Sequence, residues 1–351
     1  MDTQFKQIKI EELEAQVGKL VNGDILLGKF KTSGGEEKDL KVPIFILQGE
    51  KPGPTAVLLG GLAGTDTVSI SICYDLLEQF NPKNLAGTII FLPIINAPGY
   101  FSGSKNHPYD GKSIEDTFPG QTDGSISEQT AASVFKVIVE NADVVVRIKD
   151  EPGDITTNVY AQISGSAAVI NNNETTFQKT LSTGLEIITL EQPVEGMLGV
   201  ELAQKGNIPL ITLVAGGNDA DAERKASAQV NSALQNLLAS YEMLELNPEM
   251  PKKQYVLKQI NAFYSSFYGN LRLKQSLGDY VRKGELIAEI LNPETADKVQ
   301  VKADISGYLF QLNPNLKITQ GEKVFAILNL KEDVVSGTPG LEKDALKVVE
   351  N

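Results

Sequence analysis

The sequence predicts an α/β fold with a mixed, mostly parallel sheet flanked by helices, followed by a small all-β domain that is barrel-like or a sandwich. Up to residue 246, short apolar runs of strand length alternate with amphipathic helical patterns. Prolines and lysines at 247–254 interrupt this alternation. Over 255–331 the pattern changes to short strands of period two, separated by turns. We therefore expect an α/β domain (1–246), a linker (247–254), a β domain (255–331) and a charged tail (332–351).

The first elements follow from local composition. Helical spacing with early glutamates predicts a helix over 9–21. Two aliphatic, β-branched runs, 23–31 and 40–47, predict a hairpin joined by a loop at Ser33–Glu37.

The stretch 49–66 organises the rest of the chain. It combines a Pro/Gly turn, a buried strand at 55–59 and a glycine-rich loop that opens a helix. Loops of this kind, at the carboxyl end of a strand, carry the chemistry of α/β proteins. Here the loop offers only Ala63, Thr65 and Asp66.

Residues 96–124 are polar and rich in Gly and Pro, which predicts a long loop that is functional or forms a lid. Helices are expected over 67–80, 125–141 (which starts with the capping pattern S-I-S-E), 174–182, 198–205 and 220–244. Strands are expected over 87–95, 142–148, 158–163, 186–190 and 208–214, and in the β domain over 255–263, 269–274, 286–291, 299–303, 307–312 and 323–328.

Composition limits the function. The chain has 351 residues, a net charge of −13 and a pI of about 4.8, so we expect neither nucleic acid nor an anionic membrane as a partner. Cys73 is the only cysteine, which excludes a disulfide framework. The first residues lack the apolar segment of a signal peptide, and no apolar run has the length of a membrane span, so we expect a cytoplasmic protein. His107 is the only histidine, which leaves little room for a His/Cys zinc site.

A series of motifs, taken in order, resembles the succinylglutamate desuccinylase/aspartoacylase family of zinc-dependent deacylases. The resemblance implies a zinc carboxypeptidase-like fold for most of the chain, with a C-terminal domain related to lipoyl-type barrels. The matching motifs are K-P-G-P-T (51–55), G-L-A-G-T-D (61–66), L-P-I-I-N-A-P-G-Y (92–100), D-G-K-S-I-E-D-T-F-P-G (110–120), D-G-S-I-S-E-Q-T-A (123–131), A-D-V-V-V-R-I-K (142–149) and G-N-I-P-L-I-T-L-V-A-G-G (206–217).

The chemistry that the resemblance implies is missing at the matching positions. Two histidines and a glutamate hold zinc in the family, and Ala63, Asp66 and Lys149 stand there. Val214 stands at the position of the general base. Glu115-Asp116 replaces an Asn-Arg pair that grips the substrate carboxylate, so we expect the site to repel an anion. We therefore expect no zinc, no other cofactor and no catalytic residue.

Several residues admit two interpretations. The carboxylates of Asp66, Glu115, Asp116, Asp150 and Glu151 could converge on a hard cation, or form a solvated acidic rim in which Lys149 pairs with one of them. We expect the rim.

Other residues with possible functions have simpler interpretations that we favour. His107 could be a lone acid or base, but we expect it to be exposed in its loop. Lys298 could lie in a lipoyl-carrier hairpin, although an ordinary loop is expected there. The glycine pairs at 60–61 and 216–217 could cradle an anion or permit close packing, and Cys73 reads as inert core.

Three functions remain open. The favoured one is a non-catalytic relative that binds a small molecule or a protein, with Asp66, Asn96, Glu115, Asp116 and Lys149 lining a remodelled pocket. The alternative is an active hydrolase of N-acyl amino acids or related amides, built on an acidic/Lys site or a hard metal ion. The third is a structural subunit of a larger assembly, and a homo-oligomer is possible in each case.

Overall fold

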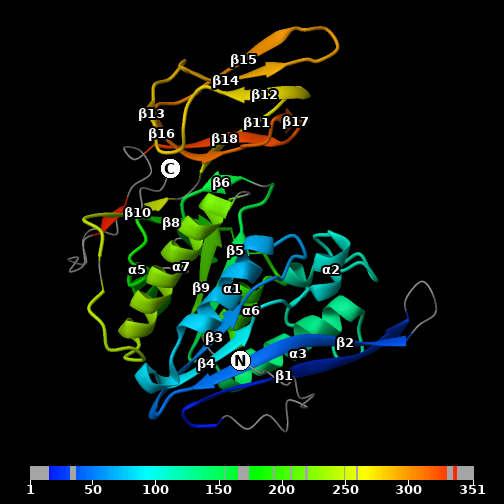
Figure 1. Cartoon of the computed structure of the whole chain (residues 1–351), viewed down its shortest axis with the longest axis vertical. Helices are drawn as coiled ribbons and strands as arrows, with labels where there is room; N and C mark the ends of the chain where they lie inside the picture. Colours follow the sequence, from blue (N-terminus) through cyan, green and yellow to red (C-terminus); the bar gives the residue numbers. More distant parts are fainter. Residues whose placement is uncertain are drawn as a thin grey trace.

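A large mixed sheet with helices on both faces lies below two smaller antiparallel sheets (Figure 1). The computed structural model describes residues 16–31, 37–153, 155–164, 174–192, 194–205, 208–217, 220–248, 250–257, 260–329 and 335–337.

The large sheet contains two groups of parallel strands, and antiparallel strands lie at both of its edges. Parallel pairs join β4, β3, β5 and β9, and also β7, β8 and β10, whereas β7 and β9 run antiparallel. The strands, in spatial order, are β1 (Lys19–Lys31), β2 (Glu37–Gln48), β4 (Ala86–Leu92), β3 (Lys51–Leu59), β5 (Val144–Asp150), β9 (Leu210–Ala215), β7 (Tyr160–Ser164), β8 (Ile187–Glu191), β10 (Gln254–Leu257) and β19 (Val335–Gly337). This confirms the predicted fold class.

Alternate residues of the central strands face two helical layers, because side chains of a strand alternate between faces. Val144 and Val146 of β5 belong to a core shared with α1 (Thr67–Gln79), α5 (Glu174–Leu181) and α7 (Ala220–Ser240). Val145 belongs to the opposite core, shared with α3 (Ile126–Asn141) and α6 (Leu198–Lys205). The capping box predicted at the start of α3 is present, with Glu128 accepting from the backbone N–H of Ser125.

The two smaller sheets pack around one core, to which Leu271, Val301 and Phe325 contribute. One sheet contains β11 (Asn261–Tyr264), β18 (Lys323–Leu328), β16 (Gly307–Leu312) and β13 (Tyr280–Val281), with β6 (Thr156–Thr157) paired to β16. The other contains β15 (Lys298–Lys302), β14 (Leu286–Leu291), β12 (Gly269–Leu273) and β17 (Lys317–Ile318).

Some predicted elements differ from the structure. Residues 19–21 begin β1 rather than ending a helix, and residues 16–18 before them form a turn. The remainder of the predicted helix, 9–15, lies outside the described residues. The predicted strand 255–263 is divided between two sheets, since β10 joins the large sheet and β11 the smaller one. The loop at 96–124 contains α2 (Ala97–Ser102) and one short 3-10 helix, Ile114–Asp116.

Two predicted segments, the C-terminal tail and the first hairpin loop, lie mainly outside the described residues. Most of the predicted tail, and the hairpin loop at 32–36, lie outside the described residues, although Val335–Gly337 pairs with β10 as a strand. Among the helices that the structure describes, none is long and apolar enough to cross a membrane.

Candidate functional site

The predicted site residues come from the carboxyl ends of three adjacent parallel strands. Asp66 follows β3 and occupies the N-cap position of α1 without a capping bond from its side chain. Lys149 and Val214 are cross-strand neighbours near the ends of β5 and β9. The smaller sheet that contains β16 and β18 approaches this edge, because Val214 packs with Phe310 and Leu328.

The glycine-rich loop after β3 is shaped by close contact with α2. A Cβ at Gly64 would lie 2.2 Å from the carbonyl carbon of Gly99, so only glycine fits. The loop closes on itself, since the carboxylate of Asp66 accepts a hydrogen bond from the backbone N–H of Ala63 at 3.2 Å. Burial raises the pKa of Asp66, and the charge of Arg147 opposes this. Asp66 is therefore a buried loop-closing carboxyl rather than an open ligand.

A partly buried ion cluster occupies the middle of the site. Glu115 accepts a hydrogen bond from Arg147 Nη1 at 2.7 Å, and Lys149 Nζ lies 3.5 Å from the same oxygen. Burial would raise the pKa of Glu115, but Arg147 and then Lys149 and Lys105 bring it down to about 2. Two cations thus flank one carboxylate, so the negative charge that the sequence predicted at Glu115 is compensated.

Asp150 ends β5 and accepts backbone N–H bonds from Val68 and Ser69, at 2.9 and 2.7 Å, in the first turn of α1. Burial and the charge of Asp66 raise its pKa to about 7, against the effect of these hydrogen bonds. Asp66 and Asp150 are thus two nearby carboxyls with raised pKa values, a feature that is frequent in sites of proton transfer.

Arg147 is the site residue that the sequence analysis missed. It is 5% exposed, and its Nε and Nη2 have no hydrogen-bond partner in the structure. The signal was present, because an arginine inside the apolar run V-V-V-R-I must be buried with a partner or a ligand.

The other predicted pocket residues have separate places. Asn96 is buried and caps α2, accepting from Gly99 N–H while its amide donates to the Lys105 carbonyl. Asp116 is exposed, and so lies outside the ion cluster. Of the five predicted pocket residues, Asp66, Glu115 and Lys149 therefore come together electrostatically, and Asn96 positions the neighbouring loop.

Glu151 does not join the other carboxylates but forms a second cluster toward the smaller sheets. Its two oxygens accept from Tyr160 Oη and Lys323 Nζ, each at 2.6 Å. Lys323 also donates to Gln311. We call these four residues the junction cluster, because β18 and β16 carry two of them. The five carboxylates that could have converged on a cation therefore do not converge.

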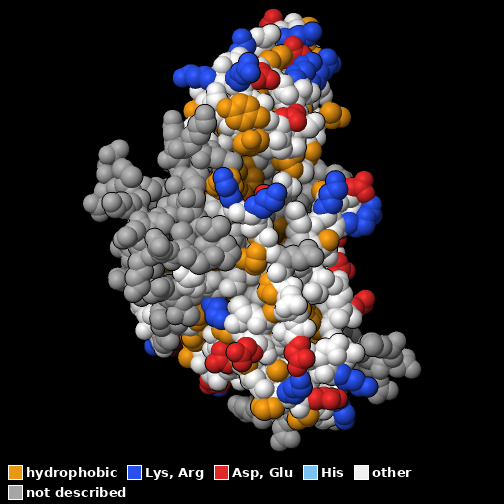
Figure 2. Space-filling model, turned by 90° about the vertical axis from the view of Figure 1, so that its left-hand side faces the viewer, with side chains coloured by type: hydrophobic (Ala, Val, Ile, Leu, Met, Phe, Trp, Pro, Cys, Tyr) orange, Lys and Arg blue, Asp and Glu red, His pale blue; other side chains and the backbone are white. Residues whose placement is uncertain are grey.

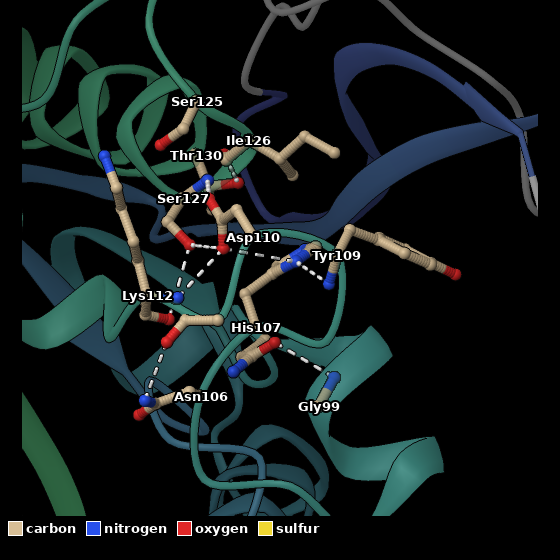
Figure 3. A network of polar contacts seen from close by, with 12 residues as sticks. Gly99, Asn106, His107, Tyr109, Asp110, Lys112, Ser125, Ile126, Ser127 and Thr130 are labelled. Atoms are coloured by element: carbon tan, nitrogen blue, oxygen red, sulfur yellow. Dashed lines mark hydrogen bonds and ion pairs between the residues drawn. The ribbon is translucent and has the colours of Figure 1, made fainter.

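His107 is buried rather than exposed, contrary to the sequence-based expectation. Its ring lies beside Tyr109 and Asp110 (Figure 3). Its Nδ1 accepts from the backbone N–H of Tyr109 at 3.4 Å and lies 4.0 Å from Asp110. Asp110 is held by Ser127, whose Oγ donates to it at 2.8 Å. Burial lowers the pKa of His107, so the imidazole is neutral at pH 7. Asp110 fixes the loop through its hydrogen bonds with Lys112 N–H and Ser127.

The remaining candidates lie apart from the site. Lys298 is exposed at the start of β15, and Cys73 is buried in the core, where burial raises the pKa of its thiol. The first glycine of each pair packs closely against backbone. A Cβ at Gly60 would lie 2.7 Å from the Pro93 carbonyl oxygen, and one at Gly216 would lie 2.6 Å from that of Ile155.

A cavity of about 660 Å³ opens on another side of the molecule. It lies between α7, β8 and the smaller sheets, and Gln229, Lys252, Tyr255 and Tyr308 line it. Figure 2 views the molecule from the side on which α7 and β8 lie in Figure 1. This face carries hydrophobic side chains with Lys and Arg side chains beside them. None of the predicted site residues lines this cavity.

Comparison with solved structures identifies proteins that have the same fold. A succinylglutamate desuccinylase from Silicibacter sp. TM1040 superposes with a TM-score of 0.75 and 20% identity, covering 88% of this chain and 95% of that one. A succinylglutamate desuccinylase/aspartoacylase from Rhodobacter sphaeroides has a TM-score of 0.72 and 18% identity, with coverage of 88% and 95%. The chain has the fold of the succinylglutamate desuccinylase/aspartoacylase family. The fold that the motif resemblance implied is thereby confirmed.

Two further similarities concern named activities. The N-alpha-acetyl-L-2,4-diaminobutyric acid deacetylase of Halomonas elongata is 24% identical over 305 residues, which are 84% of this chain and 87% of that protein. The product-bound ectoine utilization protein EutE from Ruegeria pomeroyi has a TM-score of 0.73 and 19% identity, covering 88% of this chain and 94% of that one. No family model matches the chain.

Zinc, which this family resemblance implies, does not fit the residues present. Lys149 places an ammonium at a ligand position, Ala63 has no donor atom, and Asp66 accepts from its own loop. Within the described ranges, no group of three or more His, Cys, Asp or Glu side chains is arranged to hold a metal ion.

Proposed function

We propose that this protein is a non-catalytic relative of the amidohydrolases that share its fold, and that it binds a small molecule instead of cleaving one. The partly buried Arg147–Glu115–Lys149 cluster carries this proposal. Two cations close to the implied metal position would repel a divalent cation, and they already supply positive charge to the site.

Amide hydrolysis also needs a group that activates water, and the matching position lacks one. Val214 is buried and packs with Tyr160 and Phe310, so it neither holds nor moves a proton. The loss of the base and the presence of Lys149 at a ligand position support the same proposal independently.

A turnover assay tests the proposal. N-alpha-acetyl-L-2,4-diaminobutyric acid, the substrate named for the Halomonas relative, is incubated with the purified protein with and without zinc. We expect no product above the blank. Zinc-dependent product that disappears in Asp66→Asn would overturn the proposal.

Asp66 and Asp150 support a second candidate, a hydrolase that uses a non-family acidic site. Two nearby carboxyls with raised pKa values can divide the roles of acid and base, and that of Asp150 is about 7. This candidate predicts metal-independent turnover with an inflection near pH 7 that is lost in Asp150→Asn. Absence of turnover across pH 5 to 9 counts against it.

The cytoplasm is the compartment we propose, since the lone buried Cys73 needs no oxidising environment. Light scattering of the purified chain measures whether it forms a homo-oligomer.

A further inference from the structure

The guanidinium of Arg147 has one edge that the protein does not use. Nη1 donates to Glu115, whereas Nε and Nη2 are buried without a partner. Leaving a buried donor unsatisfied costs about 1–3 kcal/mol, more for a charged group, so a ligand that satisfies both donors would bind favourably.

The two unused nitrogens are a matched pair. In a guanidinium, Nε–H and the Nη2–H beside it point the same way, and together they bind the two oxygens of a carboxylate. The bond from Nη1 to Glu115 lies on a different edge and fixes the orientation of the group.

Arg147 is also the first member of a polar row that crosses the sheet. Cross-strand pairing places Arg147 beside Thr212, Thr212 beside Gln162, and Gln162 beside Thr189, on β5, β9, β7 and β8. All four share one face, opposite to α1, α5 and α7, because their strand neighbours Val146, Ile211, Ala161 and Ile188 belong to the core on that side.

The far end of the polar row also has unused polar atoms. Gln162 Oε1 and Thr189 Oγ1 are buried and have no partner in the structure. Gln162 is two strands from Arg147, so their backbones are separated by about 10 Å. The amide oxygen of Gln162 can only accept, which calls for a donor on the ligand.

The carboxylates around Arg147 decide which kind of anion can bind there. The charges of Glu115, Asp66 and Glu191 all act on Arg147, so a phosphate dianion would meet several carboxylates. A single carboxylate with a positively charged or N–H donor at its other end fits this distribution better.

From these observations we propose that the polar row binds a small carboxylate whose other end carries a hydrogen-bond donor. The carboxylate lies on the Nε–Nη2 edge of Arg147, and the donor reaches Gln162 Oε1 and Thr189 Oγ1. The inference deepens the proposed binding function and rests on it. It names a site built from residues of this chain rather than from the positions of the family's ligands.

Three probes separate the two ends of the ligand. Binding of 4-aminobutyrate, butyrate and butylamine is measured by calorimetry, with inorganic phosphate as an anion of different shape. We expect 4-aminobutyrate to bind more tightly than butyrate, and butylamine and phosphate to bind weakly.

Matched variants test each end. Arg147→Lys keeps the charge but loses the two-pronged edge, and should weaken both carboxylates by about tenfold or more. Gln162→Leu should weaken 4-aminobutyrate several-fold and leave butyrate unchanged. Equal affinities in wild type and Arg147→Lys would overturn the site.

A spectroscopic readout on the unaltered protein covers the case in which Arg147→Lys does not fold. The chain has four arginines, Arg147, Arg224, Arg272 and Arg282, so arginine labelled with ¹⁵N gives at most four Nε–H signals. Substituting the other three in turn assigns the signal of Arg147. We expect that signal to shift on addition of 4-aminobutyrate and butyrate.

An unmoved Arg147 signal with saturating probe contradicts the inference and indicates a water-filled site. This failure is distinct from failure of the proposed function, which would be detected as turnover in the hydrolysis assay.

Discussion

The two charge clusters of this protein differ in how completely the chain satisfies them. In the junction cluster, both oxygens of Glu151 are hydrogen-bonded, by Tyr160 and Lys323, and the only unpartnered side-chain atom there is Gln311 Nε2. In the site cluster, Arg147 makes one ion pair and leaves two nitrogens unused. The first joins strands of the large and smaller sheets. The second has bonding capacity that only a ligand or water can use.

The largest effect is expected from breaking the junction cluster. Lys323→Met leaves Glu151 buried and without its cation, which should lower the free energy of unfolding by about 3–5 kcal/mol. Denaturant unfolding measures this loss. Lys51→Met, which removes an exposed pair with Glu245, is the control and should have no measurable effect. A small loss in Lys323→Met would show that the junction cluster does not stabilise the fold.

A smaller loss is expected from Glu115→Gln, because the amide oxygen can still accept from Arg147. We expect about 2 kcal/mol at neutral pH. The pKa of Glu115 is lowered to about 2 in the folded protein from 4.5, so its contribution is present above pH 4.5 and is lost as the pH falls toward 2. The difference between wild type and variant should therefore shrink over that range, and a constant difference would refute the assigned role.

Asp150 should show the opposite dependence on pH. Its pKa is raised to about 7 from 3.8, so its contribution to stability is greatest below pH 3.8 and is lost as the pH rises through 7. A ¹³C NMR titration of the carboxyl carbon should give a midpoint near 7. A midpoint near 4 would show that the N–H bonds from Val68 and Ser69 outweigh burial.

The smallest effect is expected from Gln162→Leu in the ligand-free protein. Its Oε1 has no partner, so replacing the amide with an apolar group should change the free energy of unfolding by no more than about 0.5 kcal/mol. Gln254→Leu is the matched control. Gln254 donates to the carbonyls of Leu181 and Leu185, and its loss should cost about 2 kcal/mol. Equal losses in the two variants would mean that Gln162 is already satisfied.

The sequence predicted the layers better than the contacts. Period-two and helical patterns locate β3, α1 and α3 because burial of one face determines them. Residues 255–263 were assigned to one strand because the pattern cannot show that the chain passes from one sheet to another.

The candidate site could be predicted only in part. The motifs located Asp66, Lys149 and Val214 at one sheet edge, because the carboxyl ends of parallel strands lie at the same edge of a sheet. They could not show that Glu151 turns toward Lys323, which is 172 residues away, or that Asp110 and Ser127 enclose His107. Arg147 could have been found from sequence alone, because a charged side chain within an apolar strand is buried and therefore needs a partner.

Metal content tests the central claim most directly. The purified chain is dialysed against zinc, washed and measured by mass spectrometry, beside Lys149→His, which restores one donor. We predict that wild type retains no more zinc than Asp66→Ala. One zinc ion per chain in wild type, lost in Asp66→Ala, would contradict the account and restore the metallohydrolase interpretation.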